Sequence, residues 1–400
     1  MSGSRVVEAS GPLTRPASAD EGAVAVHPLP RGGEGETENP YPSPPWGRGW
    51  PAAGVFISRG GPGEGVRPIV TIQFVLGLDL GGTKIAAGVV NSHGRLFSSV
   101  RVATPAQGVR QDLAVLFDAA HAAVKAAKIP WKKIRAVGVG VPGAFDPRAE
   151  TVWAPNLPGW SKVRLRRLLE NAFERPVLVE SDRNVQALAE AWLGLGAERQ
   201  VRDLVFLTVG TGIGAGLISE GRLIPGAHGV AGAAGWMVID RRWKPEFGRV
   251  GCFEALGAGP AVARLGRLAW ERDRRGKVPI QDSKSQIQDL KSQNHISAEI
   301  VAAAARRGDK AALRVLEEVG TNLGLGVANI VCLLNPEVVV LGGGLAGIGS
   351  PLLAPLRRAL RQWGQPLARR QVRIVLSRLG EKAGILGAAR YALIKMEEKA

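Results

Sequence analysis

A strand, a glycine turn and a second strand follow one another at two places in this 400-residue chain, and this repetition limits the folds it can adopt. Apolar, strand-like runs flank the first turn at residues 72–80 and 85–90. Similar runs flank the second turn at residues 203–209 and 214–219. Because each pair is followed by further helical and strand-like segments, the pattern predicts a duplicated α/β unit with largely parallel sheets.

The segments that follow each pair can be assigned from hydrophobic periodicity. Apolar residues recur every three or four positions over residues 313–330, which indicates a helix with one buried face. The other predicted elements are helices at 112–127, 163–172, 184–193 and 352–362, and strands at 134–141, 177–180 and 338–341. We therefore predict two lobes around a cleft, residues 71–200 and residues 201–400.

Two segments differ in composition from these lobes. Residues 1–70 contain 11 of the 26 prolines and 13 of the 53 glycines, so we expect this segment to be disordered. Near residues 275–295 the polar sequence QDSKSQ recurs as QDLKSQ. We predict a surface insertion there, because each doubling of loop length costs only about 0.6 kcal/mol.

Charge and cysteine content bear on partners and location. Lys and Arg number 52 against 35 Asp and Glu, a formal net charge of +17, which can attract nucleic acid, anionic membranes or phosphorylated ligands. The basic residues are spread along the chain, so nucleic acid is not favoured as a partner. No apolar run reaches the roughly 18–20 residues that span a bilayer. Two cysteines cannot form a disulfide framework, so we expect a reducing, cytoplasmic setting.

The first turn carries side chains suited to phosphate. In residues 79–84 (DLGGTK) an acid ends one strand and glycines precede the next. Glycines let backbone N–H groups approach phosphate oxygens, Thr83 adds a hydroxyl, and Asp79 could hold Mg²⁺ through water. The alternative is an ordinary hairpin turn with an incidental Asp.

The second turn repeats this arrangement and favours phosphate binding. Residues 208–214 (TVGTGIG) again place a threonine among glycines between two strands, and two such turns facing one cleft could clamp a polyphosphate. Residues 342–347 (GGGLAG) fit G-x-G-x-x-G, so a dinucleotide site competes. That site expects an acid about 20 residues later, which residues 364–372 lack, although Arg369 and Arg370 could meet a 2′-phosphate. An adenosine pocket is therefore favoured.

Asp182 is the candidate catalytic base. It follows the predicted strand at 177–180 and starts a helix. Asp is a good N-cap residue, so capping alone is one interpretation. The other is that Asp182 removes a hydroxyl proton before attack on a γ-phosphate, which the two glycine turns favour.

Seven motifs occur in the order seen in ROK-family sugar kinases, which the chain resembles over roughly residues 73–395. They are residues 79–84, 139–143 (VGVPG), 154–160 (APNLPGW), the segment around Asp182, residues 208–214, 251–254 (GCFE) and 342–344. The resemblance implies a duplicated actin-like, hexokinase-type (ribonuclease H-like) fold. It also implies ATP with Mg²⁺, a hexose substrate, glucokinase activity toward the 6-hydroxyl, and a homodimer.

The resemblance and the turns together assign the site residues. Asp182 is expected to be the base. The expected ATP and phosphate ligands are Asp79, Gly81, Gly82, Thr83, Lys84, Gly210, Thr211, Gly212, Gly214, Gly342, Gly343 and Gly344. The expected sugar-binding residues are Pro142, Gly143, Asn156, Asp182 and Glu254.

The chain departs from the family pattern beside the expected sugar site. Residues 232–236 (GAAGW) stand where Gly-Glu-Ile-Gly-His is usual, which replaces two sugar-binding side chains by Ala233 and Trp236. Each lost hydrogen bond costs about 0.5–1.5 kcal/mol, so sugar recognition should be altered. We expect Trp236 to fill space vacated by a zinc loop; packing against an apolar sugar face is the alternative.

Two further functions remain open at this point. One is a sugar-sensing transcriptional regulator, since relatives with an added winged helix bind DNA, although residues 1–70 lack helical periodicity. The other is a degenerate binder that holds sugar without phosphorylating it. The altered sugar ligands favour the latter, whereas Asp182 and both turns argue against it.

We predict that the purified protein carries no stoichiometric zinc. Of the four zinc ligands that the resemblance implies, only Cys252 survives in residues 245–252 (PEFGRVGC), and structural zinc needs four. Cys252 is then expected to be a buried small residue. Elemental analysis of the protein measures this, and a ratio near one zinc per chain, lost on chelation together with thermal stability, would contradict it.

Overall fold

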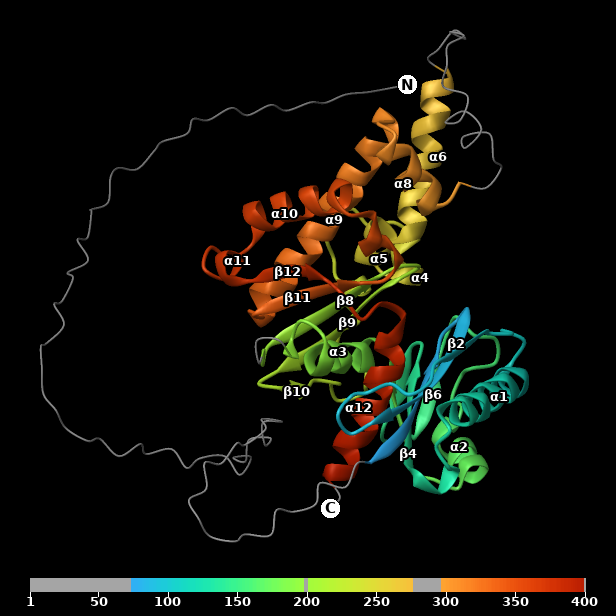
Figure 1. Cartoon of the computed structure of the whole chain (residues 1–400). Helices are drawn as coiled ribbons and strands as arrows, with labels where there is room; N and C mark the ends of the chain where they lie inside the picture. The colour runs from blue at the N-terminus through green and yellow to red at the C-terminus, as the bar shows by residue number, and fades with distance from the viewer. Residues whose placement is uncertain (1–72, 198–200, 276–295, 399–400) are drawn as a thin grey trace, which may run out of the picture. The chain divides into compact units, whose positions relative to one another are not determined.

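The computed structural model describes residues 73–197, 201–275 and 296–398 (Figure 1). The segment predicted to be disordered, residues 1–70, and residues 276–295 of the predicted insertion lie outside these ranges. All described residues belong to one unit by backbone contacts, Gly60–Ala400. No helix among them combines the length and the apolarity needed to cross a membrane.

The first sheet is built around the first glycine turn. Its strands in spatial order are β3 (Val100–Ala103), β2 (Lys84–Asn91), β1 (Phe74–Leu80), β4 (Ile134–Val141) and β7 (Val177–Ser181). The hairpin strands β1 and β2 are antiparallel, whereas β1, β4 and β7 run parallel. The central strands are almost wholly apolar because helices cover both faces of the sheet.

The second sheet repeats the first, strand for strand. Its spatial order is β10 (Arg222–Leu223), β9 (Ile213–Ser219), β8 (Leu204–Val209), β11 (Val338–Gly342) and β12 (Arg373–Leu376). The hairpin strands are again antiparallel, and β8, β11 and β12 run parallel. The duplicated α/β unit predicted from the two glycine turns is therefore confirmed.

Helices pack on both faces of each sheet. On the first sheet, α1 (Val109–Ala127) and α2 (Leu165–Phe173) share one apolar core with the strands. On the second, α9 (Lys310–Leu334) and α10 (Ser350–Trp363) pack against each other within another core. The predicted helices at 112–127, 163–172, 313–330 and 352–362 lie within these four helices or overlap them.

Helix α3 (Asp182–Leu193) contacts both sheets. Its residues pack against β4 and β7 of the first sheet and against β8 and β9 of the second. Ala189 belongs to the core that includes Val75 of β1, and Ala187 belongs to the core that includes Phe206 of β8. The position of the first residue of α3, Asp182, is therefore fixed by packing on two sides.

The C-terminal helix α12 (Ala383–Glu397) returns to the first sheet and lies beside α3, as Figure 1 shows in red. Glycines let it approach closely. A Cβ atom on Gly138 of β4 would lie 1.8 Å from the carbonyl oxygen of Ala388, and one on Gly77 of β1 would lie 2.2 Å from that of Ile385. The boundary between the lobes at residue 200 stays a prediction.

The remaining elements are short or connect these layers. They are η1 (Trp131–Lys133), β5 (Ala144–Asp146), β6 (Thr151–Trp153), η3 (Ala234–Trp236), α4 (Phe247–Val250), α5 (Cys252–Gly257), α6 (Gly259–Arg275), α8 (Ala298–Arg306), η4 (Gly344–Ile348), α11 (Ala368–Gln371) and η5 (Gly380–Lys382). Strands β5 and β6 form a separate antiparallel pair directly after β4.

Replacing Gly138 by Ala is expected to destabilise the protein by at least about 1–3 kcal/mol, because the added methyl group overlaps the α12 backbone. Gly347→Ala is the matched control, since a Cβ there meets nothing within 4 Å. Its free energy of unfolding should stay within about 0.5 kcal/mol of the parent. Urea denaturation measures both, and equal stability of the two variants would disprove close packing of α12 on β4.

Candidate active site

Two hydrogen bonds fix the backbone of the first glycine turn, and the threonine of the turn is exposed to solvent. The backbone N–H of Gly81 donates to the carbonyl of Lys84 over 2.8 Å, and the hydroxyl of Thr104 donates to the carbonyl of Gly81 over 2.8 Å. Thr83 and Lys84 are exposed, and a Cβ on Gly82 would meet no atom within 4 Å. The turn thus has open backbone, as an approaching phosphate requires.

A charged cluster lies beside this turn. Glu381 in η5 pairs with Lys84, with 3.3 Å between Nζ and Oε1, and also with Arg101 of β3. No sequence motif marked Arg101 or Glu381, because a partner almost 300 positions away leaves no local signal. Lys84 and Glu381 are largely solvated and the Arg101 side chain is 32% exposed, so the pairs contribute little to stability. Of the two cations, Arg101 acts on Asp79, because its charge lowers the pKa of that carboxyl.

The second glycine turn is braced by Glu254. The carboxylate Oε2 of Glu254 in α5 accepts the backbone N–H of Ile213 over 2.8 Å, and the backbone N–H of Gly210 donates to the carbonyl of Gly212 over 3.0 Å. Burial raises the pKa of Glu254. The described contact of Glu254 is therefore with this turn, and its predicted role as a sugar ligand stays a prediction. Thr211 is exposed at the tip.

The third glycine segment lies against the second turn. Gly342 at the end of β11 pairs in register with Thr208 of β8. A Cβ on Gly210 would lie 3.9 Å from the backbone nitrogen of Gly344. Gly343 has φ of 85° and approaches the Val209 carbonyl closely, so a larger residue would be strained there. Gly210, Gly343 and Gly344 therefore form one glycine-lined surface, whereas Gly342 is buried against the Phe206 ring.

Two carboxylates flank Gly140, where three parallel strands end together. Asp79 of β1 pairs in register with Gly140 of β4, which pairs with Glu180 of β7, and Asp182 follows that strand. A Cβ on Gly140 would lie 3.5 Å from Oδ1 of Asp79 and 3.8 Å from Cα of Asp182. The two acids predicted from separate motifs thus lie close together.

Burial perturbs both carboxylates. Burial and then the negative charge of Asp182 raise the pKa of Asp79 to about 7, although Arg101 opposes the shift. Burial also raises the pKa of Asp182, against the opposing effects of the Arg183 backbone N–H, at 2.7 Å, and the Arg183 guanidinium. A raised pKa makes a carboxylate a better proton acceptor near neutral pH, so this pair can bind a cation and take a proton.

Asp182 also lies near the second turn. The next residue, Arg183, places its Cδ atom 3.3 Å from where a Cβ on Gly214 would be. Asp79, Gly140, Asp182, Arg183 and Gly214 therefore form a continuous series of neighbours between the two glycine turns. No sequence motif marked Arg183 as a site residue, although its place beside the candidate base was a signal.

The expected sugar-binding residues lie on two segments. Pro142 and Gly143 directly follow β4, and the Gly143 carbonyl accepts the Arg183 guanidinium over 2.8 Å. Asn156 is exposed in the segment after β6, where the indole of Trp160 donates to the buried carboxylate of Asp112 over 2.8 Å. No described contact joins Asn156 to Asp182, so its role stays a prediction.

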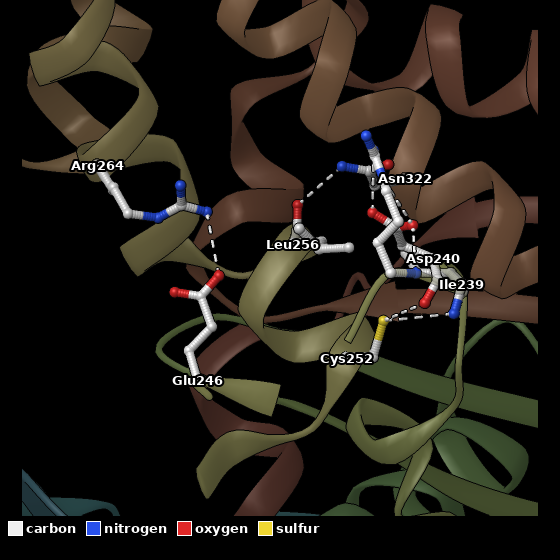
Figure 2. Close-up of polar contacts among 8 residues, drawn as sticks. Ile239, Asp240, Glu246, Cys252, Leu256, Arg264 and Asn322 are labelled. Carbon is white, nitrogen blue, oxygen red and sulfur yellow. Dashed lines mark hydrogen bonds and ion pairs between the residues drawn. The ribbon is translucent and has the colours of Figure 1, made fainter. Parts of the chain in front are cut away.

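The region of the missing zinc motif is held by ordinary polar contacts (Figure 2). Cys252 is 4% exposed, which confirms the expectation that it is buried. Its thiol accepts the backbone N–H of Ile239 over 3.5 Å and donates to the Asp240 carbonyl over 3.8 Å. Glu246 and Arg264 form an ion pair nearby at 4.0 Å. Within the described residues, no group of three or more His, Cys, Asp or Glu could hold a metal ion.

The expectation that Trp236 fills vacated space is wrong. Its side chain is 56% exposed at the end of η3, and Trp243 is 71% exposed. Because the segment packs inward through Ala234 and Gly235 instead, the indole is left outside the core. Whether Trp236 packs against a sugar face stays a prediction.

Comparison with known proteins agrees with this geometry. The sequence profile of the ROK family matches residues 75–395. The chain belongs to the ROK family. It is 31% identical over 317 residues to a glucokinase of Thermotoga maritima, covering 79% of this chain and 96% of that protein.

Two other members bear on fold and activity. A ROK family glucokinase from Streptomyces griseus, solved in complex with glucose and AMPPNP, has a TM-score of 0.66 and 32% identity, covering 80% of this chain and 99% of its own. A xylose repressor of Caldicellulosiruptor bescii is 29% identical over 353 residues, covering 86% of each chain. The ROK-family likeness and the duplicated sheets confirm the actin-like, hexokinase-type fold.

The free energy of unfolding of the metal-free parent should fall more steeply with rising pH than that of the Asp79→Asn variant. Its folded-state pKa of about 7 lies above the ordinary value, so the folded state holds a proton that the unfolded state releases. The stability from this proton is present near pH 4 and is lost as the pH rises through about 7. Urea denaturation of the parent and Asp79→Asn at about pH 5 and about pH 8 measures the difference.

Asp146→Asn is the control for this measurement. The backbone N–H groups of Ala149 and Arg148 lower the pKa of Asp146, so this exposed carboxylate is ionised throughout the range tested. Its variant should keep the pH dependence of the parent. If Asp79→Asn also kept it, Asp79 would not be protonated in the folded protein near neutral pH.

Proposed function

We propose that this chain is an ATP-dependent hexose kinase, with glucose as the preferred sugar and its 6-hydroxyl as the acceptor. The observation that carries the proposal is the pair Asp79 and Asp182 flanking Gly140 between two glycine turns. A ROK relative of 32% identity, named as a glucokinase and solved with glucose and AMPPNP, supports the sugar and the nucleotide.

In this proposal Asp182 is the base. Its carboxylate accepts the proton of the sugar hydroxyl as the hydroxyl oxygen attacks the γ-phosphorus. The bond between that phosphorus and the β,γ-bridging oxygen breaks, ADP leaves, and the proton on Asp182 passes to solvent. The raised pKa of Asp182 favours this transfer, because a base works best when its pKa is near the working pH.

The glycine turns bind the nucleotide in this proposal. Open backbone at Gly82 and the exposed Thr83 and Thr211 offer donors to phosphate oxygens, while the Gly81 N–H is used within the turn and fixes its shape. The glycine-lined surface of Gly210, Gly343 and Gly344 allows a flat group such as adenosine to lie against the backbone, and the buried Gly342 supports it from β11. Lys84 and Arg101 add positive charge beside the first turn.

The carboxylates at Gly140 suit Mg²⁺. Magnesium sites commonly use one or two carboxylates with water and substrate phosphates, rather than a cage of protein ligands. Asp79, whose pKa is raised by burial and by Asp182, would hold the cation through water. When bound, Mg²⁺ neutralises charge on the phosphate oxygens during transfer.

A regulator is the second candidate, favoured by the similarity to a xylose repressor over 86% of the chain. Such a protein would bind sugar without phosphorylating it, and its affinity for DNA would fall as the salt concentration rises. The cytoplasmic location and the homodimer stay predictions from the sequence.

Asp182→Asn is expected to lower kcat for hexose phosphorylation by about 10²–10⁴-fold, because the amide cannot accept the proton. A coupled assay of ADP release over a panel of hexoses measures this, with glucose expected to give the highest kcat/KM. The matched control is Asp203→Asn. Asp203 also accepts hydrogen bonds, from Ser219 and Glu220, but lies at the opposite end of β8 from the second turn.

The control variant should keep the activity of the parent. Equal activity of Asp182→Asn and the parent would remove Asp182 as the base. No turnover of any hexose, together with salt-sensitive binding to DNA, would favour the regulator.

A further inference from the structure

Arg183 makes several hydrogen bonds outside its own helix. Its Nη1 donates to the Gly143 carbonyl over 2.8 Å, its Nη2 to the Gly229 carbonyl over 3.2 Å, and its Nε to the Ala231 carbonyl over 3.4 Å. The side chain is half-buried. A guanidinium presents its donors in a rigid planar fork, so it can hold three carbonyls at fixed positions, which a lysine cannot.

These carbonyls belong to segments of different sheets. Gly143 follows β4 of the first sheet, whereas Gly229 and Ala231 lie between β10 of the second sheet and η3. The two segments also touch each other, because a Cβ on Gly229 would lie 2.2 Å from the carbonyl oxygen of Phe145 in β5. Arg183 therefore holds the place where backbone from the two halves meets.

Arg183 also contacts the candidate base, Asp182, and the strand that follows the second glycine turn. Its backbone N–H donates to Oδ1 of Asp182 over 2.7 Å. Its aliphatic stem lies against Gly214 beside the second glycine turn, and its carbonyl oxygen is 2.2 Å from where a Cβ on Gly216 would be. One residue thus joins the candidate base, the second turn and the segment expected to bind sugar.

We propose that Arg183 is a positioning residue that fixes the backbone around Gly143 and Gly229–Ala231 relative to Asp182. This rests on the proposed function, in which the backbone held by Arg183 sets the distance between the sugar hydroxyl and its base, Asp182. A misplacement of about 1 Å in such a geometry can lower the rate about 10²-fold.

Arg183→Met tests the proposal. Methionine keeps an aliphatic stem against Gly214 but removes the three hydrogen bonds to carbonyls. We expect kcat for the hexose to fall about 10²-fold, while the KM for ATP changes less than about two-fold because the second turn keeps its packing. Arg183→Lys should recover only part of kcat, since one ammonium cannot reproduce the fork.

Arg175→Met is the matched control. Arg175 is also a half-buried arginine that donates to backbone carbonyls, those of Ile134 at 2.9 Å and Glu174 at 2.7 Å. Ile134 is the first residue of β4, at the end remote from Gly140, and Glu174 directly follows α2. This variant should lose thermal stability comparably to Arg183→Met but keep the kcat and both KM values of the parent.

Amide hydrogen exchange supplies a readout that needs no substrate. In Arg183→Met, residues 142–146 and 226–236 should both exchange faster than in the parent, whereas Arg175→Met should leave both unchanged. Faster exchange in these segments, together with a lower kcat and a nearly unchanged KM for ATP, supports the proposal. Unchanged exchange there, or an unchanged kcat at an equal loss of thermal stability, overturns it.

The two proposals can fail separately. If the parent phosphorylates no hexose, the proposed function fails, and the exchange comparison still decides whether Arg183 ties the two segments to α3. If the parent is active and Arg183→Met is equally active, only the role of Arg183 is rejected.

Discussion

The packing of α3 between the two sheets is the constraint on which the rest of the site depends. Contacts with β4 and β7 on one side and with β8 and β9 on the other fix the helix in place. Its first residue, Asp182, lies where the parallel strands β1, β4 and β7 end together. A carboxylate on a loop would lack this support, because loops have fewer packing contacts than helices inside a core.

Glycine makes this arrangement sterically feasible. A Cβ on Gly384 of α12 would lie 2.1 Å from Oδ2 of Asp79, so the glycine there makes room for this carboxylate. A Cβ on Gly140 would crowd Val185 of α3, at 2.9 Å, so the glycine lets α3 pack close to β4 beside both acids. Burial is unfavourable for the charged form of each acid and raises both pKa values, and the negative charge of Asp182 raises that of Asp79 further. Such perturbation is common where carboxylates take part in chemistry.

Membership of the ROK family does not decide the activity by itself, because relatives of comparable similarity include both a glucokinase and a xylose repressor. The surroundings of Asp182 bear on that decision, since a regulator has no need of the base that we propose beside two glycine turns. Beside the residues expected to bind sugar, Trp236 is exposed and Arg183 is bonded to three backbone carbonyls.

The sequence determined the repeated hairpins, most strands and the long helix α9, because apolar periodicity reports directly which face of an element is buried. Motif order also gave the family and both acids. It could not give α12, which is buried on most sides and so has little polar face to mark it. Only the tertiary structure paired Glu381 with Lys84 and Arg183 with Gly229, because such contacts depend on how distant segments pack, and local patterns carry no record of that.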